Sequence, residues 1–257
     1  MIKELRDSTG ISVMQCKNAL EEAEGDTKKA LAILKKTSSA IALKKINREV
    51  KDGAVMIKLK GKKAVLVSLH CETDFVAKNS DFLAFLENLA NLALEKTSAK
   101  DKSDLDWKKE TKDMINSVIQ KTGENIQLGE IYEVSGDVLG NYVHNNKSGV
   151  IVSLEGGNTE LAKDIAMHIT AMKPEYISEK EITPEAIKTI TEIFQKEIAD
   201  IEKPPEIKKK ILDGKISAYF KEKTLPNQPF IKNSDETVGK LLEKNKARIK
   251  EVKRYSV

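Results

Sequence analysis

Cysteine and histidine are the residue types in this chain best suited to act as nucleophile and base. Cys71, with His144 or His168 and an acid, could form the nucleophilic centre of a cysteine hydrolase. However, Cys71 follows an apolar run that predicts a strand, and it carries no known nucleophile signature. A thiol in such a place is more often buried and inert, so we expect no catalytic residue and no enzyme activity.

Metal and nucleotide sites are not indicated either. The three histidines His70, His144 and His168 lack the close spacing of metal ligands. The sequence contains no GxxxxGK[ST] motif, so we do not expect the chain to bind a nucleotide through a P-loop. We therefore expect no metal and no cofactor.

The charge balance argues against specific nucleic-acid recognition. There are 44 lysines and arginines against 40 aspartates and glutamates, which gives a net charge of only +4. A nucleic-acid interface needs basic groups gathered on one face. Arginine is the residue that contacts phosphate in a bidentate manner, and the chain has only Arg6, Arg48, Arg248 and Arg254.

The cysteine count and the N-terminus bear on the compartment. The two cysteines, Cys16 and Cys71, show no CxxC spacing and are typical of free thiols in a reducing environment. The first residues, MIKELRDSTG, lack the apolar core of a signal peptide. No stretch approaches the roughly 20 apolar residues that span a bilayer. These features predict a cytoplasmic protein that does not contact membranes.

The N-terminal region predicts a module of three short helices. Ser12 and Asp26 are candidate N-caps, and Gly10 and Gly25 break the helical pattern. Apolar residues recur at helical spacing behind both caps. A lysine-rich connector over residues 37–52 predicts a linker, partly helical, so we place the first domain at residues 1–52.

The middle of the chain predicts two related α+β subdomains. Alternating apolar residues at 55–59 and 64–70 flank a turn and indicate a β-hairpin. Helices are expected from Ser80 and over about 103–121, with a strand over 126–134. A second hairpin, 141–144 with 149–154, precedes a helix that Pro174 ends. The predicted subdomains are residues 53–136 and 137–257.

Within the second subdomain, residues 183–223 predict an antiparallel helical hairpin. Two apolar stripes are separated by Lys203-Pro204-Pro205. The two apolar stripes can pack against each other. The charged outer faces of the helices suggest that the hairpin projects from the rest of the domain. The chain then continues to a short helix near 238–242 and a basic tail.

Four segments, in order along the chain, resemble one family, bacterial elongation factor Ts. They are LRDSTG at 5–10 with VMQCKNAL at 13–20, CETDFVAKN at 71–79, HITAMKP at 168–174, and QPF at 228–230. The resemblance covers nearly the whole chain. It implies a ubiquitin-associated-like helical domain, a core of two related α+β subdomains and a protruding helical hairpin. It also implies a partner, the GTPase elongation factor Tu, whose GDP release such a protein promotes.

The resemblance places the functional segment at Thr73, Asp74, Phe75 and Val76. In this family the segment binds the GTPase and disturbs its Mg²⁺ region. The residue types suit a wedge, because Phe75 is a rigid aromatic ring and Asp74 a carboxylate able to compete near the metal. From the residues alone, Phe75 and Val76 could instead be core side chains, and Asp74 could cap a helix.

Further partner contacts are expected from the same resemblance. Val13 and Met14 lie next to the break at Gly10, where the family meets the nucleotide-binding domain of the GTPase, with packing in the small three-helix core as the alternative. Lys17 is a candidate for the rim of that contact, with a solvated lysine as the alternative. His144 is a candidate contact to other domains of the partner, with an exposed turn histidine as the alternative. The helical hairpin could contact the partner or a second copy of the chain.

Two features of the sequence, one residue and one segment, depart from the family pattern. One alternative function also stays open. Family members often carry Asn at the place of His70, and residues 253–257 resemble the family's C-terminal strand cut short. The alternative is a non-catalytic interaction scaffold that binds RNA or another protein through the helical module and the lysine-rich linker. Strong salt-dependent RNA binding would favour that alternative.

Overall fold

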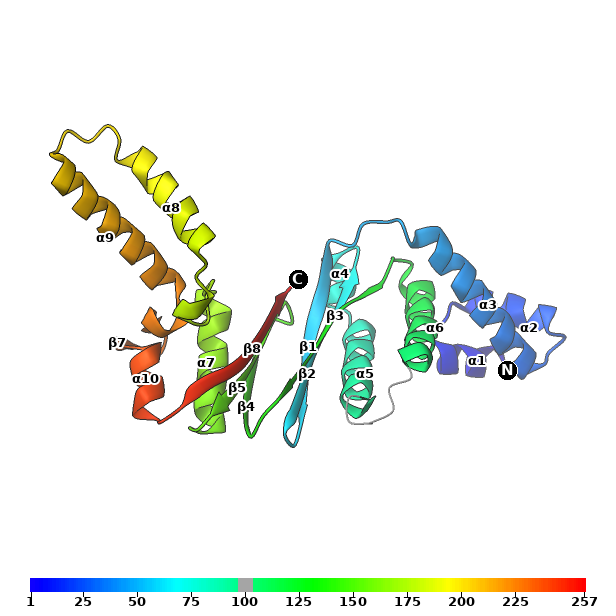
Figure 1. Ribbon diagram of the computed structural model, residues 1–257. Helices are drawn as coiled ribbons and strands as arrows, with labels where there is room; N and C mark the ends of the chain where they lie inside the picture. The colour runs from blue at the N-terminus through cyan, green and yellow to red at the C-terminus, as the bar shows by residue number, and fades with distance from the viewer. Residues whose placement is uncertain (97–103) are drawn as a thin grey trace. The chain divides into compact units, whose positions relative to one another are not determined.

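The computed structural model describes residues 1–96 and 104–257 and shows an α+β protein, as predicted (Figure 1). The chain divides into two compact units. Unit 1 comprises residues 1–133, 143–149 and 255–257, and unit 2 comprises residues 134–142 and 150–254. No helix in the described ranges is long and apolar enough to cross a membrane.

Unit 1 begins with three helices: α1 (Ile2–Thr9), α2 (Val13–Glu22) and α3 (Thr27–Lys45). Both predicted N-caps are confirmed, since the Ser12 hydroxyl accepts the Gln15 N–H and the Asp26 carboxylate accepts two N–H groups. A small core holds the three helices together: Leu5, Ile11, Cys16, Ala19, Leu20, Ala23, Ala30 and Leu34. Helix α3 continues through residues 37–45 of the connector for which a partly helical linker was expected, and this C-terminal half packs on α6 (Asp104–Thr122).

The rest of unit 1 is a three-stranded sheet covered by helices. Strands β1 (Asp52–Lys60) and β2 (Lys63–Cys71) form the predicted antiparallel hairpin, with Val55 opposite Ser68. Strand β3 (Gln127–Ser135) completes the order β1-β2-β3. Helix α5 (Ser80–Lys96) packs on β1 and β2. The predicted start of α6 at Ser103 lies outside the described residues.

The core between α5 and the sheet is aliphatic and aromatic. It contains Val65, Val67, Leu69, Phe82, Leu86 and Leu89. These side chains alternate along β2 and recur every three to four residues along α5, as burial of one strand face and one helix face requires.

Unit 2 contains most of a second three-stranded sheet with a helix packed beside it. Strands β4 (Val138–His144), β5 (Ser148–Glu155) and β8 (Arg248–Ser256) follow the order β4-β5-β8. Helices α7 (Thr159–Met172) and α10 (Val238–Lys244) contribute to its core, and short strands β6 (Pro229–Phe230) and β7 (Asn233–Thr237) pair with each other. The strand that the family resemblance suggested over 253–257 is present, and it begins earlier, at Arg248, within the segment that was expected to be a basic tail.

The helical hairpin of unit 2 consists of α8 (Pro184–Glu197) and α9 (Pro205–Lys223), which lie side by side (Figure 1). Phe194 and Tyr219 stack edge to face with ring centroids 6.0 Å apart. Lys215 pairs with Glu197 at 2.7 Å. Ile187, Ile193 and Ile207 remain exposed, so the two helices do not cover their whole apolar stripe.

Candidate functional site

The segment between β2 and α5 forms a one-turn helix, α4 (Asp74–Ala77). Thr73 is its N-cap, and its hydroxyl accepts the Val76 N–H at 3.4 Å. The same hydroxyl donates to a carboxylate oxygen of Glu124 at 2.6 Å. The cap is therefore Thr73 and not Asp74, so the alternative role proposed for Asp74 is wrong.

Phe75 is the most exposed part of α4. Its side chain is 84% exposed, whereas Val76 is half-buried against the core of unit 1 and Ala77 is buried. Full burial of a phenylalanine side chain is worth about 2–3 kcal/mol relative to exposure. The fold leaves that free energy available for an external contact. The core alternative is wrong for Phe75 and partly right for Val76.

Asp74 forms an ion pair at the surface. A carboxylate oxygen of Asp74 lies 2.6 Å from Lys78 Nζ, one helical turn away. The hydrogen bond to Asp74, followed by its charge, raises the pKa of the Lys78 ammonium. Exposed pairs of this kind contribute little to stability. A partner cation can therefore replace Lys78 at Asp74 at small cost.

The chemistry of Cys71 does not fit a nucleophile. The thiol is buried, and its Sγ donates to the Thr73 carbonyl oxygen at 3.1 Å. Burial, followed by the negative charges of Glu124 and Asp52, raises the pKa of the Cys71 thiol to about 12. His168 is fully buried in unit 2 and uses both ring nitrogens, with Gln228 and with the Ile231 N–H. Among the described residues, no cluster of three potential metal ligands occurs.

We expect Cys71 to resist alkylation in the folded protein. At about pH 8 only about one thiol in ten thousand is ionised for a pKa near 12, and the thiolate is the reactive form. Iodoacetamide followed by peptide mass spectrometry should label Cys71 only after unfolding in urea. Rapid labelling of the native chain at Cys71 would contradict this assignment.

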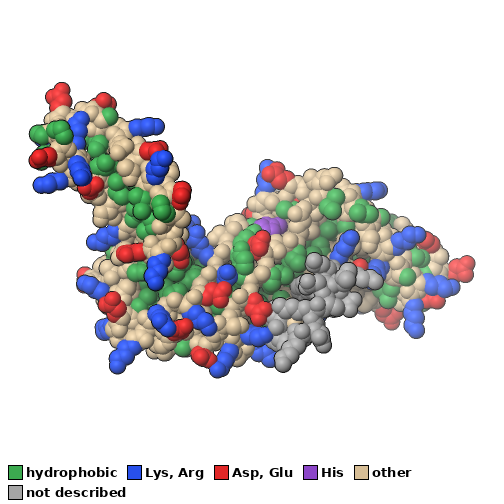
Figure 2. Space-filling model, viewed as in Figure 1, with side chains coloured by type: hydrophobic (Ala, Val, Ile, Leu, Met, Phe, Trp, Pro, Cys, Tyr) green, Lys and Arg blue, Asp and Glu red, His purple; other side chains and the backbone are tan. Residues whose placement is uncertain are grey.

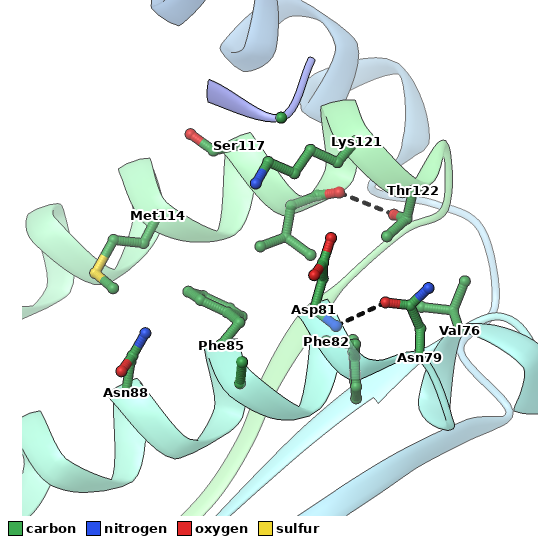
Figure 3. A pocket seen from close by; sticks show the side chains of 13 residues that line it. Val76, Asn79, Asp81, Phe82, Phe85, Asn88, Met114, Ser117, Lys121 and Thr122 are labelled. Atoms are coloured by element: carbon green, nitrogen blue, oxygen red, sulfur yellow. Dashed lines mark hydrogen bonds between the residues drawn. The ribbon is translucent and has the colours of Figure 1, made fainter. Parts of the chain in front are cut away.

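An open groove of about 640 Å³ in unit 1 connects α4 with the turn between α1 and α2. Figure 3 shows Phe85 of α5 and Met114 of α6 lining it from two facing helices, with Lys121 and Asp81 pointing into it. Val76 borders one end and Gly10 also lines it. The groove joins the segment that carries Phe75 to the turn that leads into α2.

Val13 and Met14 open α2 on an exposed surface. Their side chains are 51% and 64% exposed, whereas Cys16 and Leu20 on the same helix are buried. Lys17 forms an exposed ion pair with Glu21 at 3.5 Å. The two exposed apolar side chains are not needed for the small helical core, which leaves them free for an external contact.

Gly10 is required by the turn between α1 and α2. It adopts φ 65°, ψ 12°, the left-handed conformation that ends α1, and its N–H donates to the Arg6 carbonyl. A Cβ there would lie 2.6 Å from Lys121 Nζ, which is the movable end of a long side chain. The backbone conformation is therefore the main constraint.

We expect Gly10→Ala to destabilise the chain by about 1–2 kcal/mol, the cost of a left-handed residue with a Cβ. Urea unfolding followed by circular dichroism measures it. Gly214→Ala in the middle of α9, where a Cβ meets nothing within 4 Å, is the matched control and should not destabilise. Equal effects of the two substitutions would contradict the conformational argument.

The sequence-predicted residues fall into separate places. Thr73, Asp74, Phe75 and Val76 belong to one turn, and the groove links Val76 with Gly10. Lys17 and His144 line neither α4 nor the groove; His144 ends β4, exposed beside a turn whose Asn145 amide lies 3.3 Å from its Nε2. Glu124 was missed by sequence reasoning, because nothing local links it to a segment 51 residues earlier.

The charge on the face of the molecule drawn in Figure 2 is mixed. Figure 2 shows lysines and arginines interspersed with aspartates and glutamates over the visible face, without a continuous basic patch. The mixture of charges on this face agrees with the small net charge of +4.

Comparisons with known proteins agree with one another. A family model described as Elongation factor TS matches residues 72–257. A protein of Hahella chejuensis named elongation factor Ts is 42% identical over 260 residues, covering 100% of this chain and 90% of the relative. Proteins of the same name from Thioalkalivibrio sulfidiphilus and Deinococcus deserti are 40% and 38% identical, covering 100% and 94% of this chain and 90% and 93% of their own lengths.

Proposed function

The chain belongs to the elongation factor Ts family, and we propose that it binds the GTPase elongation factor Tu in its GDP form and promotes GDP release during translation elongation. The observation that carries this proposal is the exposed Phe75 on a one-turn helix whose backbone is fixed by Thr73. A fixed, exposed aromatic ring beside a carboxylate is suited to insertion into another protein.

The mechanism follows from how GTPases hold GDP. They bind the phosphates through backbone amides and a Mg²⁺ ion. An exchange factor must fit the GTPase better when metal and nucleotide are absent, and the coupling is reciprocal, so GDP weakens the factor as much as the factor weakens GDP. We assign the insertion to Phe75, and competition near the metal region to Asp74, with Thr73 and Val76 holding both in place.

A second contact is proposed at the start of α2. Val13 and Met14 are exposed apolar side chains, and methionine adapts well to partner surfaces. The groove that links Gly10 to Val76 makes one continuous surface of unit 1 for the nucleotide-binding domain of the GTPase. Lys17 would lie at its rim.

The remaining features of the family stay predictions for this chain. His144 is proposed as a contact to other domains of the GTPase. The first three helices are proposed to be a ubiquitin-associated-like domain, and the two hairpin-plus-helix regions to be related subdomains. The exposed isoleucines of α8 and α9 are proposed to serve a contact with the partner or with a second copy.

The direct test is release of a fluorescent GDP analogue from elongation factor Tu, chased with excess unlabelled GDP, with and without this protein. We expect a large acceleration that saturates with protein concentration. Fluorescence-detected RNA binding at low and high salt, run in parallel, tests the scaffold alternative. No acceleration from folded protein with active GTPase would overturn the exchange function.

A further inference from the structure

A carboxylate from the loop after α6 holds the residues that begin α4. Glu124 Oε2 accepts the backbone N–H groups of Glu72 at 3.0 Å and Thr73 at 3.1 Å. Glu124 Oε1 accepts the Thr73 hydroxyl at 2.6 Å. That hydroxyl in turn accepts the Val76 N–H. Three hydrogen bonds to one charged group therefore fix both the backbone and the cap of the short helix.

Glu72, whose N–H donates to Glu124, also binds the loop after α6 through its own carboxylate. Glu72 Oε1 accepts the Asn125 N–H at 2.6 Å and lies 3.5 Å from Arg48 Nη1. The Asn125 side chain donates to the Arg48 carbonyl oxygen at 2.7 Å. We call Glu72, Glu124 and Asn125 the clasp. It joins the start of α4, the loop after α6 and the linker that follows α3.

The local backbone explains why Glu124 can reach α4. Gly123 has φ 74°, a left-handed conformation that ends α6 and turns the chain. The Glu124 N–H donates to the Thr122 hydroxyl at 3.3 Å, and Lys45 Nζ donates to the Gly123 carbonyl. The loop that carries Glu124 is thus itself held in place.

A helix of one turn does not form on its own. Nucleation fixes several backbone dihedrals for a single hydrogen bond, so it is unfavourable without outside support. In α4 the internal bonds are few, namely Ala77 N–H to the Thr73 carbonyl at 3.2 Å and Lys78 N–H to the Asp74 carbonyl at 3.0 Å. Outside support comes from Ala77 and Val76, which pack on the core of unit 1, and from the clasp.

We propose that Glu124 is a positioning residue for α4: it holds the turn that presents Asp74 and Phe75 to the partner, without contacting the partner itself. This inference rests on the proposed exchange function. A pre-ordered segment binds without the cost of ordering it at the moment of contact. Replacing Glu124 should therefore reduce the contribution of Phe75 to GDP release by a larger free energy than it reduces the free energy of unfolding.

Three variants separate the geometry from the charge. Glu124→Ala removes all three hydrogen bonds. Glu124→Gln keeps an oxygen to accept both backbone N–H groups, and its NH₂ can donate to the Thr73 hydroxyl. Glu133→Ala, which removes an ion pair with Lys63 at 3.5 Å on the sheet, is the matched control.

The first measurement uses the free protein and needs no partner. Amide hydrogen exchange followed by mass spectrometry reports opening of α4. Glu124→Ala should raise exchange at the Val76, Ala77 and Lys78 amides about tenfold or more, since hydrogen bonds to charged groups are among the stronger ones. Glu124→Gln should restore most of the protection, and Glu133→Ala should leave it unchanged. Unaltered protection in Glu124→Ala would overturn the proposal.

The second measurement is GDP release from elongation factor Tu at increasing concentrations of each variant. Glu124→Ala should lower the maximal release rate about tenfold, with a smaller change in the half-saturating concentration, because contacts at Val13 and Met14 persist. In a background that carries both Phe75→Ala and Asp74→Asn the same substitution should have almost no further effect, because both side chains that α4 presents are then already changed. A purely structural role would give additive losses instead.

The two measurements distinguish failure of the exchange function from failure of the positioning role of Glu124. If the wild-type chain does not accelerate GDP release but Glu124→Ala still loosens α4, the exchange function fails and the positioning of α4 stands. If the wild-type chain accelerates release and Glu124→Ala matches it, Glu124 has no positioning role in exchange. Additive losses in the background of Phe75→Ala with Asp74→Asn would also overturn the proposal.

Discussion

Phe75→Ala is expected to lower the acceleration of GDP release from elongation factor Tu about 30-fold or more. A buried aromatic anchor at an interface is typically worth at least about 2 kcal/mol, which corresponds to that factor. The ring is 84% exposed in the free chain, so its burial can occur only in a complex. Stopped-flow fluorescence of labelled GDP at saturating protein gives the rate.

The stability of the free protein is the internal control for this variant. Because Phe75 makes little contact within the chain, Phe75→Ala should change the free energy of unfolding by less than about 0.5 kcal/mol. Leu43→Ala, which truncates an exposed apolar side chain on α3, is the matched surface control and should leave the release rate unchanged. Full acceleration by a folded Phe75→Ala variant would move the insertion away from α4.

Asp74 can be examined in the same assay. Asp74→Asn keeps the shape of the side chain and removes the charge that holds Lys78 at 2.6 Å. A loss of release rate in Asp74→Asn that is not reproduced by Lys78→Ala would assign the effect to the Asp74 carboxylate and not to the ion pair. Together with Phe75→Ala, this comparison separates the role of Asp74 from that of Phe75, which the sequence alone could not do.

Long periodic elements could be predicted from the sequence, because burial of one face imposes a repeat. The hairpin of β1 and β2 and helix α5 were predicted from alternation and from a spacing of three to four residues. Helix α4 could not be predicted, because one turn is too short to show a period. Only the end of strand β8, residues 253–256, was expected, and this came from the family resemblance; its start was not predicted because its basic side chains mask a weak alternation.

Only part of the candidate site could be predicted from the sequence, because some of its contacts join residues that are far apart along the chain. Exposure of Phe75 cannot be read from residue type, since phenylalanine is usually buried. The bonds from Glu72 and Thr73 to Glu124 join residues 51 to 52 positions apart. Hydrogen bonds at that separation leave no pattern in a single sequence, so the clasp appeared only in three dimensions.

His168→Ala is expected to destabilise the chain by about 3 kcal/mol or more. His168 is fully buried on α7, where the Ile231 N–H donates to Nδ1 at 3.2 Å and Nε2 lies 3.0 Å from the Gln228 side-chain oxygen. Because Nδ1 accepts, the neutral ring carries its proton on Nε2 and donates it to Gln228. Removing the ring leaves a cavity, and it takes a partner away from the buried Gln228 side chain and from the partly buried Ile231 N–H.

The Gln228 amide extends this arrangement to the end of α9. Its Nε2 donates to the Glu222 carbonyl oxygen at 2.8 Å, so α7, α9 and the segment at 228–231 meet at one histidine. Urea unfolding of His168→Ala should show a lower midpoint. His144→Ala, at an exposed turn, is the matched control and should stay within about 0.5 kcal/mol of the wild type.

The same histidine should make stability depend on pH. Burial lowers the pKa of His168 below its usual value, against the hydrogen bond that His168 donates to Gln228, which raises it. The unfolded chain therefore binds the proton first as the pH falls, and stability decreases from about pH 6.5 downward until the folded pKa is reached. Burial also lowers the pKa of His70, which adds to the decrease, so His70→Asn serves as the background.

In that background, comparison with and without His168→Ala isolates the contribution of His168. Its slope should not exceed about 1.4 kcal/mol per pH unit, the limit for one proton. The variant should lose less stability than its parent between about pH 7 and 5, because it has no buried imidazole left to protonate. A parallel pH dependence in the two proteins would show that the imidazole of His168 accepts a proton in the folded chain as readily as in the unfolded one.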